Sequence, residues 1–303
     1  MAARNVLIVL LHGIGDCLMA LPAIEALKQQ SSNIKITVMT INNPLYHDLF
    51  KYNKLIDHLL FSTLPFNPHY GNPLRFFRER QVIKKDVQRA VEKYQFTDVY
   101  VVKMFLTPAK IYAHLPLPGY KKHKSFRVAR ELGVTLHGKP SYTINYHAKD
   151  RAWAVLFLRE KNLSAKKLIG LHFTGSAPSK SLPAADGQRI VNYLKLKGYD
   201  SLLFHDKHSY AREEIHYDPA LVTTYISDNI LHTAALIDQC TEFIGVDSGL
   251  AHIAAARNKK VFVLFFREVW RQNSLMLGSH VHAFTYRKNG RGTLRELRLF
   301  LQQ

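Results

Sequence analysis

Short apolar segments alternate with amphipathic segments through the first half of the chain. Apolar residues are almost continuous over Asn5–Leu11, which predicts a buried strand, and Cys17–Gln30 has helical spacing, with Pro22 expected to start, kink or shorten its first turns. The pattern continues with strands at Lys35–Thr40, Ile56–Phe61 and Asp98–Val102 and helices at Asn43–Lys51 and Arg75–Tyr94. Strands that alternate with helices predict a parallel sheet covered by helices on both faces.

The same alternation begins again after an irregular, proline-containing segment at Gly138–Asp150. The expected helices are Arg151–Lys161, Asp186–Leu196, Ile230–Asp238 and Ala251–Ala256, and the expected strands are Leu168–Phe173, Ser201–Phe204, Glu242–Val246 and Lys260–Phe266. A chain of 303 residues favours two domains, which we place at 1–150 and 151–303. The helical pattern at Leu294–Leu301 leaves open whether the last helix packs back on the first domain.

The charge balance points to an acidic partner. Lysine and arginine number 42 against 23 aspartate and glutamate residues, which gives a net charge of +19. A surplus of this size fits a phosphate-bearing substrate, an anionic membrane face or nucleic acid. The densest basic clusters are Lys121–Lys124 and Arg75–Lys85, which form either a solvated surface or a docking face for an acidic acceptor.

The cysteine content and the hydropathy pattern indicate the cellular compartment in which the protein is expected. Cys17 and Cys240 offer no disulfide framework and no metal-ligand set, which fits a reducing environment. The first apolar run is too short and too interrupted for a signal peptide. No stretch reaches the roughly 18 to 20 apolar residues that a transmembrane helix requires. We therefore expect a cytoplasmic protein, and contact with a membrane surface stays open.

The first candidate loop, His12–Asp16, follows the first predicted strand and opens a helix. Glycines allow close approach of a ligand, and a helix N-terminus favours anions. The third glycine of a dinucleotide fingerprint is absent, because position 18 is Leu, and Met39 and Thr40 replace the acid expected after the second strand. A nicotinamide or flavin site is therefore disfavoured. Asp16 either caps the helix or faces a ligand.

Two further loops follow strands in the second half. Thr174–Lys180 is rich in Gly, Ser, Thr and Pro and ends in a lysine, a composition that suits phosphate oxygens as well as an ordinary surface loop. Gly245–His252 can cap a helix through Asp247 or Ser248. His12–Asp16 and Gly245–His252 lie near opposite ends of the chain, and each follows a strand and opens a helix. We therefore expect two α/β domains that face each other across a cleft with an anionic ligand.

Together, the three loops resemble glycosyltransferase family 9, the ADP-heptose:lipopolysaccharide heptosyltransferases and their relatives. In that family a Gly-Asp turn precedes an apolar helix with a proline, as in Gly15–Ala23 of this chain. A His-Pro-Gly-Ala type of loop leads to Pro-Ser-Lys and a further proline, as in His172–Pro183, where Phe173 replaces the first proline. A Gly-Val-Asp-Ser/Thr-Gly-x-x-His segment matches Gly245–His252.

The resemblance implies a GT-B fold of two facing Rossmann-like domains, with acceptor held by the first and nucleotide sugar by the second. It implies that Asp16 is the catalytic base, which acts with inversion, and that Lys180 stabilises the departing nucleotide. His252 is expected to steady its loop, and domain closure to bring Asp16 to the donor. The implied donor-binding residues are Gly13, Gly15, Thr174, Ser176, Lys180, Asp247, Ser248, Gly249 and His252. No metal and no other cofactor is implied.

Two departures from the family pattern leave the donor base and sugar open. Phe265-Phe266-Arg267 stand where relatives often have Gly-Pro-Thr in a loop that shapes the nucleotide pocket. His208-Ser209, followed by Glu213 and Glu214, stand where relatives often have a His-Glu pair near the ribose.

Three classes of function follow. The leading interpretation is an inverting, metal-independent glycosyltransferase that moves a heptose from a nucleoside-diphosphate sugar, with ADP-heptose favoured, to lipopolysaccharide core or another surface glycan at the inner face of the membrane. A protein acceptor, or a non-catalytic nucleotide-sugar binder of the same fold, is the alternative. A nucleic-acid-binding protein would require a basic stripe with stacking aromatics, for which Tyr70–Lys85 is a faint candidate, and no nucleic acid is expected.

Overall fold

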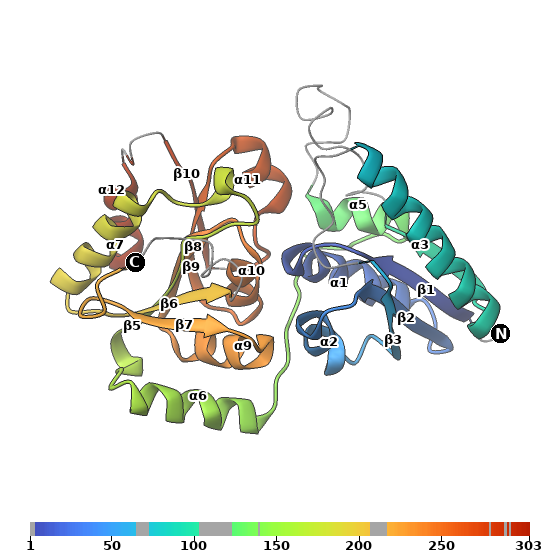
Figure 1. Ribbon diagram of the computed structural model, residues 1–303, viewed down its shortest axis with the longest axis horizontal. Coiled ribbons are helices and arrows are strands. Elements are labelled where there is room, and N and C mark those ends of the chain that lie inside the picture. The colour runs from blue at the N-terminus through green and yellow to red at the C-terminus, as the bar shows by residue number, and fades with distance from the viewer. Residues whose placement is uncertain are drawn as a thin grey trace. The chain divides into compact units, whose positions relative to one another are not determined.

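The computed structural model divides the chain into two compact units, Met1–Tyr142 and Thr143–Gln303 (Figure 1). The boundary lies eight residues before the one expected from the sequence, so that the segment from Thr143 to Asp150 belongs to the second unit. The structure describes residues 4–64, 73–102, 123–138, 140–206, 217–278, 280–287, 290 and 292–303. None of the helices in this described part combines the length and apolar character that crossing a bilayer requires.

The first unit contains a four-stranded parallel sheet. Its strands are β1 (Arg4–Leu10), β2 (Ile34–Ile41), β3 (His58–Ser62) and β4 (Asp98–Val101), and its described helices are α1 (Ile14–Gln29), α2 (Pro44–Lys51), α3 (Pro73–Tyr94) and α5 (Lys124–Glu131). The strand order is β3-β2-β1-β4, with Val6 of β1 in register with Ile36 and Asp98. The central strand β1 is buried from Val6 to Leu10, as its continuous apolar sequence predicts.

The second unit contains a six-stranded parallel sheet. Its strands are β5 (Leu168–His172), β6 (Asp200–Asp206), β7 (Thr223–Ser227), β8 (Glu242–Val246), β9 (Lys260–Phe265) and β10 (Val281–Thr285). Its described helices are α6 (Ala148–Glu160), α7 (Ala184–Leu196), α9 (Ile230–Gln239), α10 (Gly249–Ala256), α11 (Glu268–Ser274) and α12 (Thr293–Gln302), with short 3₁₀ turns η1 (Ala165–Lys167) and η2 (Pro178–Lys180). The order β10-β9-β8-β5-β6-β7 is that of a doubly wound Rossmann-like sheet.

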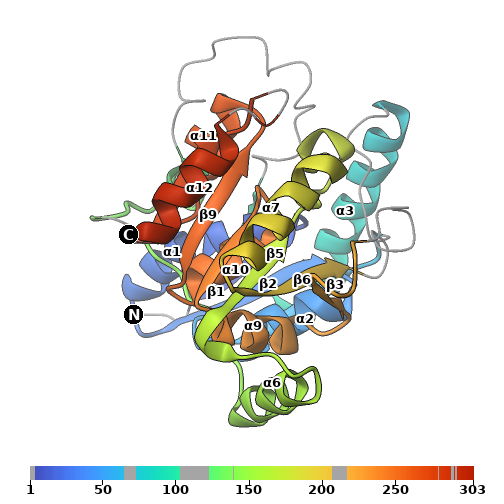
Figure 2. The same ribbon diagram turned by 90° about the vertical axis from the view of Figure 1, so that its left-hand side faces the viewer.

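Helices α7 and α12 cover one face of the second sheet and lie side by side (Figure 2). Leu194 of α7 and Leu297 and Phe300 of α12 belong to one buried cluster with the sheet residues, and the Phe300 ring lies 5.5 Å from that of Phe262. The last helix therefore packs within the second unit. This is the alternative to the packing on the first domain that the sequence left open.

The expected α/β pattern is confirmed, and most strand and helix bounds agree with the sequence to within three residues. Helix α1 begins at Ile14 and continues through Pro22, so the proline neither starts nor shortens it. Pro22 is buried with its neighbours, and their packing offsets the backbone hydrogen bond that a proline cannot donate. The segments β7, β10, α5 and α11 are additional to those expected from the sequence.

Candidate active site

Asp16 lies in the first turn of α1, directly after the central strand of the first sheet. Gly13 is the N-cap of this helix and has no side-chain capping bond, so Asp16 is not the capping residue. Its Oδ1 lies 2.7 Å from the Lys124 Nζ, with the two side chains 24% and 20% exposed. Asp16 is therefore a carboxylate that is ion-paired and still open to solvent, at the helix start where the sequence expected it.

Lys124 is a site residue that sequence reasoning did not assign. It opens α5, and the hydroxyl of the next residue, Ser125, donates to the Met19 carbonyl of α1 at 2.7 Å. This contact holds the start of α5 against α1 and brings the lysine to Asp16. The available signal was the basic cluster Lys121–Lys124, of which positions 121 and 122 lie outside the described residues.

His12 holds the same loop against the end of the neighbouring strand. Its Nε2 donates to the Val102 carbonyl oxygen at 3.2 Å, just after β4. Burial lowers the pKa of His12 to about 4, against the opposing influence of the nearby Asp16 carboxylate, so the ring is neutral near pH 7. Since β1 and β4 flank the point where the sheet order reverses, the loop occupies the edge where open α/β sheets bind ligands.

The second unit places a corresponding cluster at its own reversal point, between β5 and β8. His172 ends β5, and its ring nitrogens lie 2.9 Å from the Ser248 hydroxyl oxygen and 3.3 Å from that of Thr174. The histidine thus joins the loop after β5 to the loop after β8. His172 therefore brings together Thr174 and Ser248, the two hydroxyl-bearing residues expected at a donor site. The sequence analysis included His172 in the loop motif but assigned it no role.

The sequence left open whether Asp247 or Ser248 caps the helix, and the structure gives the two residues different roles. Ser248 is the N-cap of α10, and its hydroxyl accepts from the Ala251 amide at 3.4 Å. Asp247 is 6% exposed, and its Oδ2 lies 2.9 Å from the Lys180 Nζ, whose side chain is 25% exposed. The carboxylate is therefore buried while the ammonium group it holds remains accessible.

Gly175 allows the loop before Lys180 to fold back on itself. A Cβ at this position would lie 2.5 Å from the Lys180 Cβ and 2.7 Å from its carbonyl oxygen. The Ser181 hydroxyl accepts from the Gly175 amide at 3.0 Å and closes the turn. Only a residue without a side chain fits such an approach, so Gly175 helps to determine where the lysine lies.

The other expected donor residues differ in accessibility. Ser176 is exposed and Gly249 is half-buried at the start of α10. His252, one turn further along this helix, is buried and does not lie on the open surface. The segment His208-Ser209 with Glu213 and Glu214 lies outside the described residues. Among the residues that the structure does describe, no group of three or more potential metal ligands occurs.

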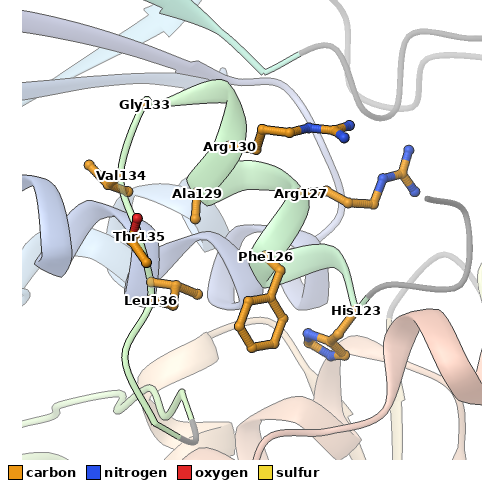
Figure 3. Close-up of a pocket in the computed structure, with 9 residues that line it drawn as sticks. All are labelled: His123, Phe126, Arg127, Ala129, Arg130, Gly133, Val134, Thr135 and Leu136. Atoms are coloured by element: carbon orange, nitrogen blue, oxygen red, sulfur yellow. The ribbon is translucent and has the colours of Figure 1, made fainter. Parts of the chain in front are cut away.

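A hollow of about 670 Å³ opens beside α5 in the first unit (Figure 3). It is lined by His123, Phe126, Arg127, Ala129, Arg130, Gly133, Val134, Thr135 and Leu136. Figure 3 shows the guanidinium groups of Arg127 and Arg130 extending from the same side of the helix. Phe126, 39% exposed, adds an apolar surface. The hollow therefore combines positive charge with apolar lining close in sequence to Lys124.

Chemically, the two clusters are complementary. The first offers a carboxylate that can accept a proton, and the second offers an ammonium group, hydroxyls and the amides of a helix start, which can hold phosphate oxygens. Each cluster lies at the ligand-binding edge of its own sheet.

Comparisons with known proteins indicate which family the chain resembles and which fold it has. The model of glycosyltransferase family 9 (heptosyltransferase) matches residues 123–268, a span that includes Lys124, Lys180 and the loop after β8. No curated protein matches the chain significantly in sequence.

Solved structures match over nearly the whole chain. A glycosyl transferase family 9 protein from Veillonella parvula has a TM-score of 0.69 at 16% identity, with 99% of this chain and 92% of that chain covered. ADP-heptose lps heptosyltransferase II of E. coli gives 0.69 at 16% identity, and E. coli heptosyltransferase WaaC with ADP gives 0.64 at 16%, each with 99% of both chains covered. WaaC with ADP-2-deoxy-2-fluoro heptose gives 0.62 at 14%, again with 99% of both chains covered. The resemblance seen in the loops is thus matched by the family model over residues 123–268, and the solved structures show that the chain has the GT-B fold of heptosyltransferases.

Proposed function

We propose that the protein is an inverting glycosyltransferase that transfers a heptose or a related sugar from a nucleoside-diphosphate sugar, with ADP-heptose as the first choice, to a hydroxyl of lipopolysaccharide core or another surface glycan. The observation that carries the proposal is the Asp16 carboxylate, which is held by Lys124 at 2.7 Å and remains partly open at the ligand edge of the first sheet. ADP and ADP-2-deoxy-2-fluoro heptose in the structures of WaaC support the choice of donor.

In the proposed reaction Asp16 is the general base. Its carboxylate takes the proton of the acceptor hydroxyl while that oxygen forms a bond to the anomeric carbon of the donor. The bond from this carbon to the diphosphate oxygen breaks, and the nucleoside diphosphate leaves with the electron pair. Attack from the face opposite the leaving group inverts the anomeric centre. A positioned base contributes about 10²- to 10⁴-fold to such a step.

Residues of the second unit would bind the donor. Lys180 is accessible and is held in place by the buried Asp247, which suits an ammonium group that meets the leaving diphosphate. Ser248 and the backbone around Gly249 would supply hydroxyl and amide donors at the start of α10, and Thr174 and the exposed Ser176 would supply hydroxyls from the loop after β5. We propose that these fixed dipoles and Lys180 offset the charge of the leaving group without a metal ion.

The acceptor would lie against α5. Lys124, Arg127 and Arg130 recur every three residues, a spacing that places side chains along one side of a helix. These cations fit an acidic acceptor, and the net charge of +19 fits an anionic surface. We therefore propose a phosphorylated or otherwise acidic glycolipid acceptor and action in the cytoplasm at the inner membrane face, with a protein acceptor as the alternative.

The decisive test compares Asp16→Asn with Asp48→Asn, which alters another carboxylate of the first unit. ADP release from ADP-heptose is measured with heptose-free lipopolysaccharide core as the acceptor, and ADP binding is measured by calorimetry. Asp16→Asn is expected to lower kcat by about 10³-fold and to leave the affinity for ADP within about twofold. Asp48→Asn is expected to leave both unchanged.

Two results would overturn the proposal. Equal turnover by Asp16→Asn and the unaltered protein would remove Asp16 as the base. Tight ADP binding by the unaltered protein, without release of ADP in the presence of core glycan or acceptor peptides, would identify a nucleotide-sugar binder instead.

A further inference from the structure

A second cation lies near Lys180 in the second unit, at the end of β9. Arg267 is the N-cap of α11 and is exposed, and its Cζ lies 5.0 Å from the centroid of the Trp270 ring. The Lys180 Nζ lies 4.9 Å from the same centroid. Asp247 is connected to this region as well, because its amide donates to the Leu264 carbonyl of β9 at 3.2 Å. One aromatic ring is therefore shared by two cations.

The carboxylates of this region do not balance the two cations. Asp247 is paired with Lys180. Glu268, next to Arg267 in sequence, lies 2.6 Å from Arg271, whose hydrogen bonds lower the pKa of Glu268 to about 2. Within the described part of the chain, no carboxylate lies at ion-pairing distance from Arg267. The cluster of Lys180, Arg267 and Asp247 therefore has an excess positive charge.

Trp270 limits the separation of the two cations. Because both lie about 5 Å from one ring centroid, their charged groups are at most about 10 Å apart. Cation–π attraction to the ring offsets part of their mutual repulsion. A diphosphate, which carries several charged oxygens, fits such a pair of cations better than a single charged group does.

We propose that Arg267 is a second diphosphate-binding cation of this protein and that Trp270 is the positioning residue that holds it beside Lys180. The inference rests on the proposed function and deepens it, because it assigns the recognition of the diphosphate to two side chains rather than one. It also gives a role to Arg267, which the sequence showed as a departure from the pattern of relatives. Lys180 is anchored by a buried carboxylate, whereas Arg267 lies against an aromatic ring and, among the residues that the structure describes, has no carboxylate partner.

The test measures binding of inorganic pyrophosphate, ADP and adenosine by calorimetry at two salt concentrations. Arg267→Ala is expected to lower the affinity for pyrophosphate and for ADP by about tenfold or more and to reduce the salt dependence of both affinities. The affinity for adenosine is expected to stay unchanged. Arg298→Ala removes the same charge from an exposed position on α12 and is the matched control. It is expected to change each affinity by less than twofold.

Substitutions of Trp270 distinguish a role in positioning Arg267 from a role in folding. Trp270→Phe keeps an aromatic face and is expected to retain affinity for ADP within about threefold, whereas Trp270→Leu is expected to lose as much as Arg267→Ala. The double variant Arg267→Ala with Trp270→Leu should lose little more than either single one, because both remove the same contact. Arg267→Lys, which keeps the charge, should restore part of the affinity.

The inference is overturned if Arg267→Ala weakens pyrophosphate no more than Arg298→Ala does. It is also overturned if Trp270→Leu weakens adenosine as much as ADP, since the ring would then bind the nucleoside. These outcomes are distinct from failure of the proposed function. Failure of that function appears as absence of ADP release by the unaltered protein, whatever its affinity for pyrophosphate.

Discussion

The two units contain the same pair of groups, a carboxylate and a lysine at the ligand edge of a parallel sheet, in different settings. In the first unit Asp16 and Lys124 are exposed to a similar, limited degree. In the second unit Asp247 is buried while Lys180 remains accessible. The first pair offers a substrate both a base and a cation, whereas the second offers only the cation. The difference in burial matches the difference in proposed chemistry, proton removal in one unit and anion binding in the other.

Removing the two lysines should give the largest contrast. Lys180→Met is expected to lower kcat by about 10²- to 10³-fold, as loss of a group that stabilises developing charge does in other enzymes. Lys124→Met is expected to cost about tenfold at most near neutral pH, because Asp16 remains in place. Steady-state kinetics with ADP-heptose measure both, and Lys180→Arg, which keeps the charge, should recover part of the rate. Equal losses for the two methionine variants would contradict the assignment of different roles.

Removing the two carboxylate charges should give a contrast in the same direction when stability is measured. Asp247→Asn leaves Lys180 without its buried partner and is expected to lower the free energy of unfolding by about 2 kcal/mol. The expectation lies below the range for fully buried pairs because Lys180 reaches solvent. Asp16→Asn, at a more exposed pair, is expected to cost less than about 1 kcal/mol. Urea unfolding of both variants checks this, and a larger loss for Asp16→Asn would break the comparison.

The first loop should also make stability depend on pH. The pKa of His12 is about 4 in the folded protein and 6.5 in the unfolded chain, so the unfolded chain binds more protons between these values. The stabilisation is present in full above pH 6.5 and falls as the pH is lowered, by about 2 kcal/mol at pH 5. Charges that face the ring are Asp16, which raises the pKa, and Lys124, which lowers it.

His12→Gln should remove most of this pH dependence, since Gln can donate to the Val102 carbonyl but does not titrate. His47→Gln, at an exposed position of the same unit, is the control and should leave the dependence unchanged. Unfolding midpoints between pH 5 and 8 provide the measurement. A His12→Gln variant that is as sensitive to acid as the unaltered protein would show that another group is responsible.

The sequence was most informative about elements that are buried or end in a motif. β1 and β8 are continuous apolar runs, so their location followed from the pattern alone. β7 alternates buried and exposed positions at the edge of its sheet, and its Thr and Ser content resembles a loop. α5 begins with Lys124, within a cluster that sequence alone could only describe as basic. Half-buried edge elements carry too weak a hydrophobic signal to be separated from loops.

For the candidate site, too, the sequence predicted some features and not others. Asp16, Lys180 and Asp247 were predicted as site residues from the loop motifs that carry them. Their ion pairs were not, because Asp16 and Lys124 are 108 residues apart and Lys180 and Asp247 are 67 apart. Local periodicity contains no information about which distant side chains meet, whereas the parallel order of strands brings their carboxyl ends to one edge.

The smallest expected contrast concerns the glycines of the two loops. A Cβ on Gly175 would overlap the backbone of Lys180, whereas one on Gly13 would meet only the Asp16 Oδ2, at 3.8 Å. Gly13 also has φ −62° and ψ 159°, a conformation open to alanine. Gly175→Ala is therefore expected to lower the free energy of unfolding by about 1 to 2 kcal/mol. It is also expected to weaken the binding of ADP, because the altered turn must shift Lys180. Gly13→Ala is expected to cost about 0.5 to 1 kcal/mol, because Ala is a poorer N-cap than Gly, and to leave the affinity for ADP unchanged. Equal effects in urea unfolding and calorimetry would mean that the position of Lys180 does not depend on this close approach.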